Sequence, residues 1–96
     1  MDVCWVVGQA VATVKDDALR SAKILICRAS GPDGQPAGEP FAATDTVGAG
    51  EHELVLVARG SAARATARTR EMPTDAAIVG ILDSLTVNGE TTYRKT

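Results

Sequence analysis

Aromatic residues are scarce in this chain of 96 residues, where Trp5, Phe41 and Tyr93 make up only 3% of the sequence. Hydrophobic residues nevertheless reach 45%, so the core has to be built mainly from valine, isoleucine, leucine and alanine. The scarcity also argues against a surface that stacks nucleic-acid bases on aromatic rings placed between basic side chains.

Cysteine and histidine are equally scarce. The two cysteines, Cys4 and Cys27, lie far apart without a CxxC pair, and His52 is the sole histidine. A Cys/His zinc site needs four such ligands at short spacings. We therefore expect no metal and no other cofactor, and we interpret the cysteines as buried structural thiols that stay reduced.

Long apolar runs and an excess of positive charge are also missing. No run approaches the ~18 apolar residues that a membrane-spanning helix needs, and the apolar run that begins at Val3 has no basic leader. The net charge of −2 and the pI of about 5.2 argue against a general nucleic-acid binder. We expect a soluble, cytoplasmic protein with no membrane and no nucleic-acid partner.

The length indicates one small domain over residues 1–96. A chain this short buries only about two-thirds of the surface that its unfolded form exposes. Packing against another subunit would add to that burial, so an oligomer is expected.

Short apolar runs between turn residues predict a mainly β fold with about five strands. The expected strands are Val3–Val14, Lys23–Arg28, Phe41–Asp45, Glu53–Ala58 and an apolar run over Asp75–Val87. Strands at this spacing indicate a small closed or partly closed barrel. Asn88-Gly89 is a strong hairpin signal, with residues 91–94 returning as an edge strand.

The connections carry one predicted helix. Ser61 is a suitable N-cap before good helix formers, so a short α-helix of about two turns is expected there. Residues 30–38 and 47–50 are predicted loops because glycine and proline are frequent in them. Residues 66–74 are expected to be irregular.

The first strand is apolar on both alternating faces, a pattern typical of a strand that is buried on both sides. In so small a chain the second cover could be a neighbouring subunit. Gly8 interrupts the strand and predicts a bulge, a bend or a close backbone approach.

Three features allow both a chemical and a simpler interpretation. His52 could act as a general base with Ser61 or Ser84 as nucleophile, but neither serine lies in a nucleophile motif and a surface loop histidine is favoured. Carboxylates at strand ends could do acid–base chemistry, but they more often accept hydrogen bonds from turn amides. These carboxylates are Asp45, Asp75 and Asp83. The Gly48–Gly50 loop lacks the GK[ST] ending of a phosphate loop and is interpreted as a tight turn.

A local basic cluster comprises Arg59, Arg64, Arg68 and Arg70. Arg64 and Arg68 are four residues apart and would share one face of a helix. Ion pairs between subunits or a solvated face are the favoured interpretations. The alternative is a small oligomeric barrel that binds single-stranded nucleic acid or an anionic ligand through these four arginines.

Three stretches resemble the EutN/CcmL family of bacterial microcompartment vertex proteins. They are Val6–Lys15 with Leu19 and Lys23–Leu25; Asp45–Gly50 running into Leu54–Val57 and Gly60–Arg64; and Asp75–Asp83. The resemblance covers nearly the whole chain in order. The Gly31–Pro40 loop and the Arg64–Arg70 segment depart from the usual pattern, and either could adapt the subunit to particular neighbours.

The resemblance implies a small OB-like barrel of five strands with a short helix and no catalysis. It implies a homopentamer that caps the five-fold vertices of a polyhedral shell in the cytoplasm, beside hexameric shell proteins. We expect the subunit interface or a loop at a central opening to use nine residues. They are Gly8, Ala10, Ala12, Asp45, Gly48, Gly50, Gly60, Ser61 and Arg64.

Overall fold

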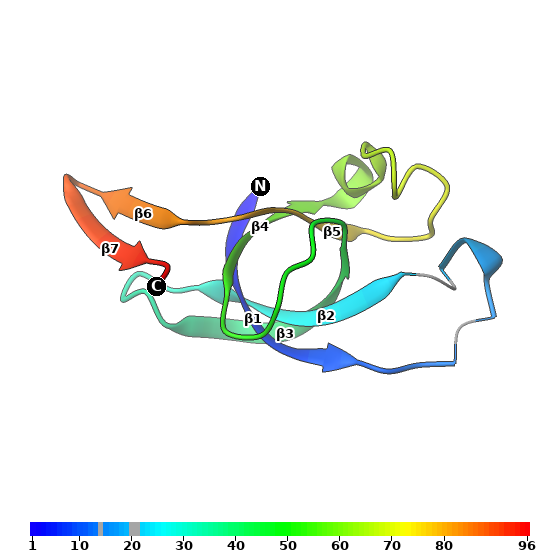
Figure 1. Cartoon of the computed structure of the whole chain (residues 1–96), viewed down its shortest axis with the longest axis horizontal. Coiled ribbons are helices and arrows are strands. Elements are labelled where there is room, and N and C mark those ends of the chain that lie inside the picture. Colours follow the sequence, from blue (N-terminus) through cyan, green and yellow to red (C-terminus); the bar gives the residue numbers. More distant parts are fainter. Residues whose placement is uncertain (14, 20–21) are drawn as a thin grey trace.

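The computed structural model describes residues 1–13, 15–19 and 22–96, and within them seven strands and two short 3₁₀ helices. The strands are β1 (Asp2–Ala10), β2 (Lys23–Ser30), β3 (Pro36–Asp45), β4 (Leu54–Arg59), β5 (Ala76–Ile81), β6 (Ser84–Val87) and β7 (Glu90–Arg94). The 3₁₀ helices are η1 (Asp17–Leu19) and η2 (Gly60–Arg64). Five strands close into a barrel in the order β1-β2-β3-β5-β4 (Figure 1). The predicted five-stranded barrel is confirmed.

Barrel closure depends on one short parallel contact. All other barrel neighbours are antiparallel, whereas β3 and β5 run parallel and pair only at Thr44↔Ala77 and Asp45↔Ile78. The other closing seam joins β1 to β4, from Asp2↔Val57 to Trp5↔Leu54. Closure leaves few free edges within the barrel.

The core consists of small aliphatic side chains and two thiols, as the shortage of aromatics predicts. Burial alternates along β1 and β2, with Cys4, Val6, Leu25 and Cys27 pointing inward. The core is completed by Ala43, Ala49, Val55, Val57, Ala76 and Ile78. Small side chains allow the strands of so narrow a barrel to approach one another closely.

The first strand is buried on one face only within the chain, so the prediction of two buried faces is not met by a single subunit. Val7 is 38% exposed and Val11, just beyond the strand, is 92% exposed. The register shifts between Val6 and Gly8, which confirms the irregularity predicted there. The strand ends at Ala10, earlier than expected, and Val14 lies outside the described residues.

The third strand begins five residues earlier than predicted, so the last part of the expected loop, from Pro36 to Gly38, is strand. The turn itself is short and closes with a hydrogen bond from the Gly31 N–H to the Gln35 carbonyl oxygen. Residues 38–40 form an irregularity where the register shifts, and Gly38 adopts a φ of 78° there. Proline is tolerated at the first residue of a strand and at a bulge, which is why Pro36 and Pro40 do not stop β3.

The predicted α-helix is a 3₁₀ helix of five residues, and Ser61 is not its cap. Arg59 occupies the N-cap position without a capping side-chain hydrogen bond. Gly60 has a φ of 65° and its N–H donates to the Asp75 carbonyl oxygen, so the chain turns too sharply there for an α-helical first turn. Residues 66–74 are irregular, as predicted, and buried Thr69 anchors them by donating to the Ala63 carbonyl oxygen at 2.6 Å.

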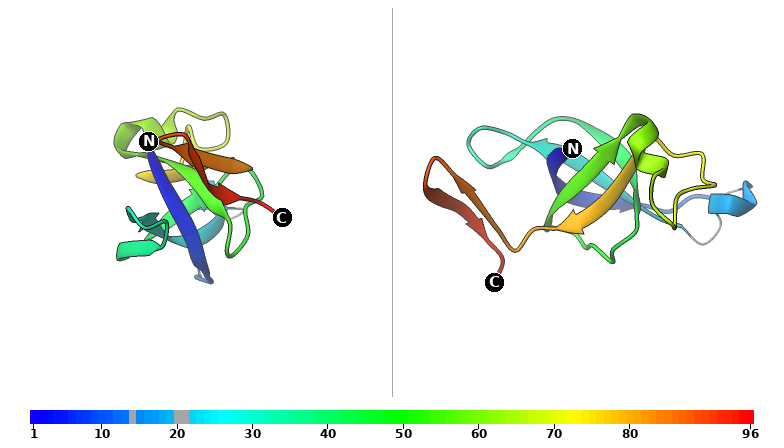
Figure 2. Two further views of the ribbon diagram at one scale, coloured as in Figure 1. Left: turned by 90° about the vertical axis from the view of Figure 1, so that its left-hand side faces the viewer. Right: turned by 90° about the horizontal axis from the view of Figure 1, so that it is seen from above.

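The last two strands form a separate hairpin that projects from the barrel (Figures 1 and 2). Its turn has positive φ at Asn88 (52°) and at Gly89 (80°), as a type I′ turn requires, and confirms the predicted hairpin. The hairpin lengthens the molecule to 44 × 24 × 23 Å.

Candidate assembly surfaces

The loop after β3 is held by a nearly buried carboxylate. The Asp45 side chain, 3% exposed, accepts hydrogen bonds from the Val47 N–H (3.1 Å) and the Ala49 N–H (3.0 Å). The Lys23 ammonium lies 3.9 Å from Asp45 and donates to the Ala49 carbonyl oxygen at 2.7 Å. Asp45 therefore accepts from turn amides, as predicted, and the loop has a fixed shape.

A second carboxylate ties the same loop to the C-terminal segment. Glu53 accepts from the Gly50 N–H at 2.6 Å and forms an ion pair with Lys95 at 2.8 Å. The hydrogen bond from Lys95, followed by that from Gly50, lowers the pKa of Glu53 below its usual value. The same bond raises the pKa of Lys95. Gly48, at the tip of the loop, has a φ of 80°, which favours glycine.

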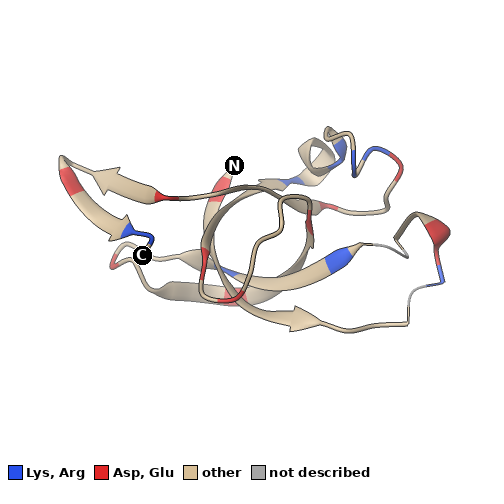
Figure 3. Cartoon of the chain, viewed as in Figure 1, with Lys and Arg blue, Asp and Glu red and all other residues tan. Residues whose placement is uncertain are grey.

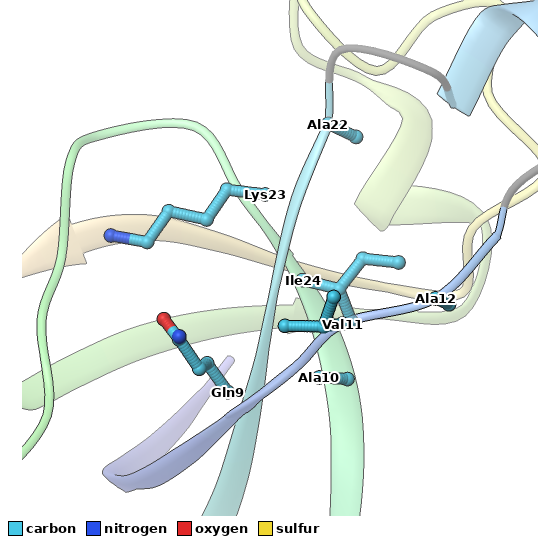
Figure 4. A pocket seen from close by; sticks show the side chains of 7 residues that line it. All are labelled: Gln9, Ala10, Val11, Ala12, Ala22, Lys23 and Ile24. Atoms are coloured by element: carbon cyan, nitrogen blue, oxygen red, sulfur yellow. The ribbon is translucent and has the colours of Figure 1, made fainter.

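Two of the predicted interface residues, Ala10 and Ala12, lie where β1 leaves the barrel. They line a shallow surface pocket with Val11, Lys23 and Ile24 (Figure 4). Ala10 is half-buried and Ala12 is exposed. Gly8, also predicted, lies at the nearby register shift, and a Cβ placed on it would make an ordinary 3.9 Å contact with Ile26. This end of β1 is an apolar surface that one chain leaves uncovered.

Gly60, Ser61 and Arg64 belong to η2 and not to the loop after β3. Ser61 and Arg64 are exposed, and the Arg64 Nη1 donates to the Thr74 carbonyl oxygen at 3.2 Å. The nine predicted residues thus form three groups: one in the loop after β3, one at the end of β1, and one in η2.

Two of the four arginines make contacts within the chain. Arg59 lies over the Phe41 ring at 4.1 Å and pairs with Asp2 at 3.6 Å. Because η2 ends at Arg64, that residue and Arg68 do not share a helix face, and the expectation that they would is wrong. Arg68 and Arg70 follow in the irregular segment after η2.

The catalytic interpretations find no support in the described residues. His52 is exposed in the loop, where its N–H donates to the Val6 carbonyl oxygen, while Ser61 and Ser84 lie in η2 and β6. No group of three or more histidine, cysteine or acidic side chains in the described residues is placed to hold a metal ion. Asp75 and Asp83 are exposed.

The two cysteines are free and buried, as predicted. Desolvation raises the pKa of each thiol to about 11. A thiol with so high a pKa stays protonated near neutral pH and is a poor nucleophile. Cys4 and Cys27 are therefore packing residues.

The sequence interpretation missed Lys23, Glu53 and Lys95 as determinants of the loop. The position of Glu53 beside a glycine-rich turn was the available signal for that residue, whereas Lys23 lies on β2, 26 residues before Ala49, and carried no such signal. No sequence pattern indicated Lys95, because 42 residues separate it from its partner Glu53 and only the tertiary fold brings them together.

These features define a class of protein: a small closed β-barrel whose conspicuous surfaces are an uncovered apolar strand end, a rigid glycine loop and a projecting hairpin. No helix of the described residues is long and apolar enough to cross a membrane.

Comparison with known proteins identifies the family. Residues 1–83 match the family described as ethanolamine utilisation protein EutN/carboxysome. The chain is 40% identical over 95 residues to the carboxysome shell vertex protein CcmL of Thermosynechococcus vestitus, covering 99% of this chain and 96% of that protein. The structure of Gloeobacter violaceus CcmL superimposes with a TM-score of 0.91 at 37% identity, covering 99% of this chain and 98% of that one.

A further solved structure is the GrpN pentameric microcompartment shell protein from Rhodospirillum rubrum. It has a TM-score of 0.79 at 36% identity and covers 91% of this chain and all of that one. The chain belongs to the EutN/CcmL family. Because its relatives are shell vertex proteins, it is a structural protein and not an enzyme.

Proposed function

We propose that this chain forms a homopentamer that occupies the five-fold vertices of a bacterial microcompartment shell, in contact with hexameric shell proteins on the facets. The observation that carries the proposal is the match of the whole barrel to a CcmL structure with a TM-score of 0.91. The pentameric assembly of the related GrpN protein supports the same oligomeric state.

The proposed mechanism is geometric. A contact between two different surfaces of identical subunits closes into a ring when its rotation is right. A five-fold unit among six-fold units introduces the curvature that closes a polyhedral shell. No chemical step is required of any side chain.

Within this proposal the end of β1 is a subunit contact. Ala10, Val11 and Ala12 present small apolar side chains, and Val11 is 92% exposed in the single chain. The apolar pattern of the first strand predicts two buried faces. A neighbouring subunit that covers this surface would supply the second one. Gly60, Ser61 and Arg64 in η2 are the other proposed contact.

The loop held by Asp45 and Glu53 is the proposed lining of a central opening. Its shape is set within each subunit by hydrogen bonds to the Val47, Ala49 and Gly50 amides. A preformed loop would let five copies meet around an axis without reordering, and Gly48 would add no side chain there.

The native mass of the purified protein tests the proposal. Five chains of 9.9 kDa should give a particle of about 50 kDa by native mass spectrometry or light scattering. A 10 kDa monomer at micromolar concentration would remove the geometric mechanism. Co-expression with hexameric shell proteins then tests the vertex role: closed shells are expected with this chain, and open or elongated assemblies without it.

A further inference from the structure

The projecting hairpin and the turn after β2 together form a groove at one end of the molecule. The turn contributes Ser30–Gly34 and the hairpin contributes Leu85, Val87, Glu90 and neighbouring residues around a volume of about 370 Å³. Val87 is 48% exposed and Leu85 is half-buried, so apolar surface remains uncovered there. The groove is therefore a surface on which another chain could dock.

The groove is acidic. Asp33 and Glu90 line it from opposite walls, and none of the lysines and arginines that the structure describes lines it. Asp33 accepts one hydrogen bond, from the Gln35 N–H, and Glu90 has no ion pair within the described part of the chain. Arg94 lies further along β7 and does not line the groove. A basic segment would match both the shape and the charge.

This chain carries such a segment at its opposite end. Arg68 and Arg70 are exposed in the irregular stretch after η2, and Figure 3 shows this stretch far from the hairpin. In contrast to Arg59 and Arg64, neither makes an ion pair or hydrogen bond with the described residues. Two free positive charges at one end thus complement two acids at the other.

The hairpin also lacks support within its own chain. An isolated two-stranded hairpin is at best marginally stable in water. Few contacts tie it to the barrel within the described residues: the Tyr93 ring meets Trp5 edge-on at 5.4 Å, and Lys95, just after β7, pairs with Glu53. A neighbouring subunit would supply the missing cover.

We propose that in the assembled ring the acidic groove of each subunit receives the Arg68–Arg70 segment of the next copy. The inference rests on the pentamer proposed above and adds which two surfaces meet. A groove at one end and a segment at the other form a heterologous contact, the kind that generates rings. Complementary charges set the orientation and register of such a contact. Because the Arg68–Arg70 segment enters the groove of its neighbour, successive subunits of the ring overlap.

Charge reversal tests the contact. Glu90→Arg should raise the protein concentration at which half of the chains are in rings by about tenfold or more, because it places like charges together. Arg70→Glu should do the same. Combining Glu90→Arg with Arg70→Glu or with Arg68→Glu should restore assembly to within about threefold of wild type. Native mass spectrometry or mass photometry over a dilution series measures the ring fraction.

The control is Glu39→Arg, which reverses an exposed acid on β3 outside the groove. It should leave the ring fraction unchanged, and circular dichroism should show that every variant is folded. The inference is overturned if Glu90→Arg assembles like wild type, if neither combination improves on the single reversals, or if Glu39→Arg is as disruptive as Glu90→Arg. A wild-type protein that stays monomeric would instead refute the pentamer itself.

An equimolar mixture of the two single variants adds a further check. In a heterologous ring each favourable contact needs the two variants to alternate, and five is an odd number. At least one like-charged contact therefore remains in every mixed ring. The mixture should recover less ring than the double variant, and equal recovery would contradict the assigned contact.

Discussion

At the scale of single residues, two carboxylates give the loop after β3 its shape. Asp45 and Glu53 flank the loop and accept hydrogen bonds from three of its amides. Each also faces an ammonium group, Lys23 or Lys95. Backbone amides in a turn have no ladder partner, so these carboxylates take the place of strand neighbours.

Asp45→Asn should destabilise the subunit. The amide side chain keeps one acceptor oxygen but presents an NH₂ group where Asp45 accepts from Val47 or Ala49. An unsatisfied buried group costs about 1–3 kcal/mol. Urea unfolding of wild type and variant, at one fixed protein concentration, measures the difference. Equal stability would mean that the loop does not depend on this carboxylate.

The Glu53–Lys95 pair should make stability depend on pH. Because the folded state lowers the pKa of Glu53 from 4.5, its contribution is complete above that value and is lost as pH falls through the lowered pKa. Glu53→Gln should therefore be less stable than wild type near neutral pH, and the difference should shrink as the pH falls below 4.5. Urea unfolding at a series of pH values measures it.

The same pair behaves oppositely at high pH. The pKa of Lys95 is raised from 10.5, so its contribution is complete below that value and declines as pH rises through the raised pKa. Exposed ion pairs contribute little to the free energy of unfolding, and the Lys95 side chain is 42% exposed. A difference between wild type and Glu53→Gln that stayed constant from pH 7 to about pH 3 would contradict the assigned role.

At the scale of elements, η2 shows how tertiary contacts override helix signals. Ser61 followed by alanines is a good N-terminal pattern for an α-helix, yet the segment is five residues of 3₁₀ helix. The Gly60 N–H bonds to Asp75 just before β5, and Thr69 pulls the chain back onto Ala63. Because Thr69 bonds back to Ala63, six residues earlier, the chain reverses before two α-helical turns could form.

Ser61→Ala should leave the stability of the subunit unchanged within about 0.5 kcal/mol, since Ser61 is exposed and caps nothing. A true N-cap serine would cost about 1 kcal/mol on replacement. Chemical unfolding distinguishes the two values. If Ser61→Ala lost ring assembly with stability intact, Ser61 would belong to the subunit contact proposed for η2.

At the scale of the whole molecule, the single chain leaves apolar surfaces exposed at both of its ends. The end of β1 exposes Val11, and the hairpin leaves Val87 exposed at the far end. A small barrel with two such projections is elongated, as Figure 2 shows. Ring formation would cover both projections at once.

Ala12→Asp should abolish the ring. The proposed contact would bury this carboxylate without a partner, at a cost of several kcal/mol. Ala12 is exposed in the single chain, so the variant should still fold as a monomer with the far-UV spectrum of a β-barrel. Native mass measurement decides, and normal assembly would place Ala12 on a solvent-facing surface.

His52→Ala serves as the matched control for that experiment. His52 is exposed, and its backbone N–H rather than its ring makes the contact to Val6. Assembly of the variant should equal wild type. The positive φ of 69° at this residue is a property of the backbone and does not involve the imidazole. A loss of assembly would therefore show that the imidazole contacts a neighbouring subunit.

The sequence by itself determined the strands, the hairpin and the composition of the core. Alternation along β1 and β2, and the Asn88-Gly89 turn, are local patterns whose physical causes lie within a few residues. The sequence also showed that recognisable catalytic and metal-binding motifs are missing, and it carried the resemblance to the EutN/CcmL family. These inferences needed no knowledge of which segments meet in space.

The tertiary structure alone decided which distant residues meet. The Glu53–Lys95 ion pair, the Lys23–Asp45 ion pair and the hydrogen bond from the Gly60 N–H to Asp75 all join residues that are remote from each other in the chain. Local propensity cannot anticipate them, because the free energy of a contact with a remote residue exists only once the barrel has closed. The opposition of the acidic groove and the Arg68–Arg70 segment is likewise a property of the closed fold.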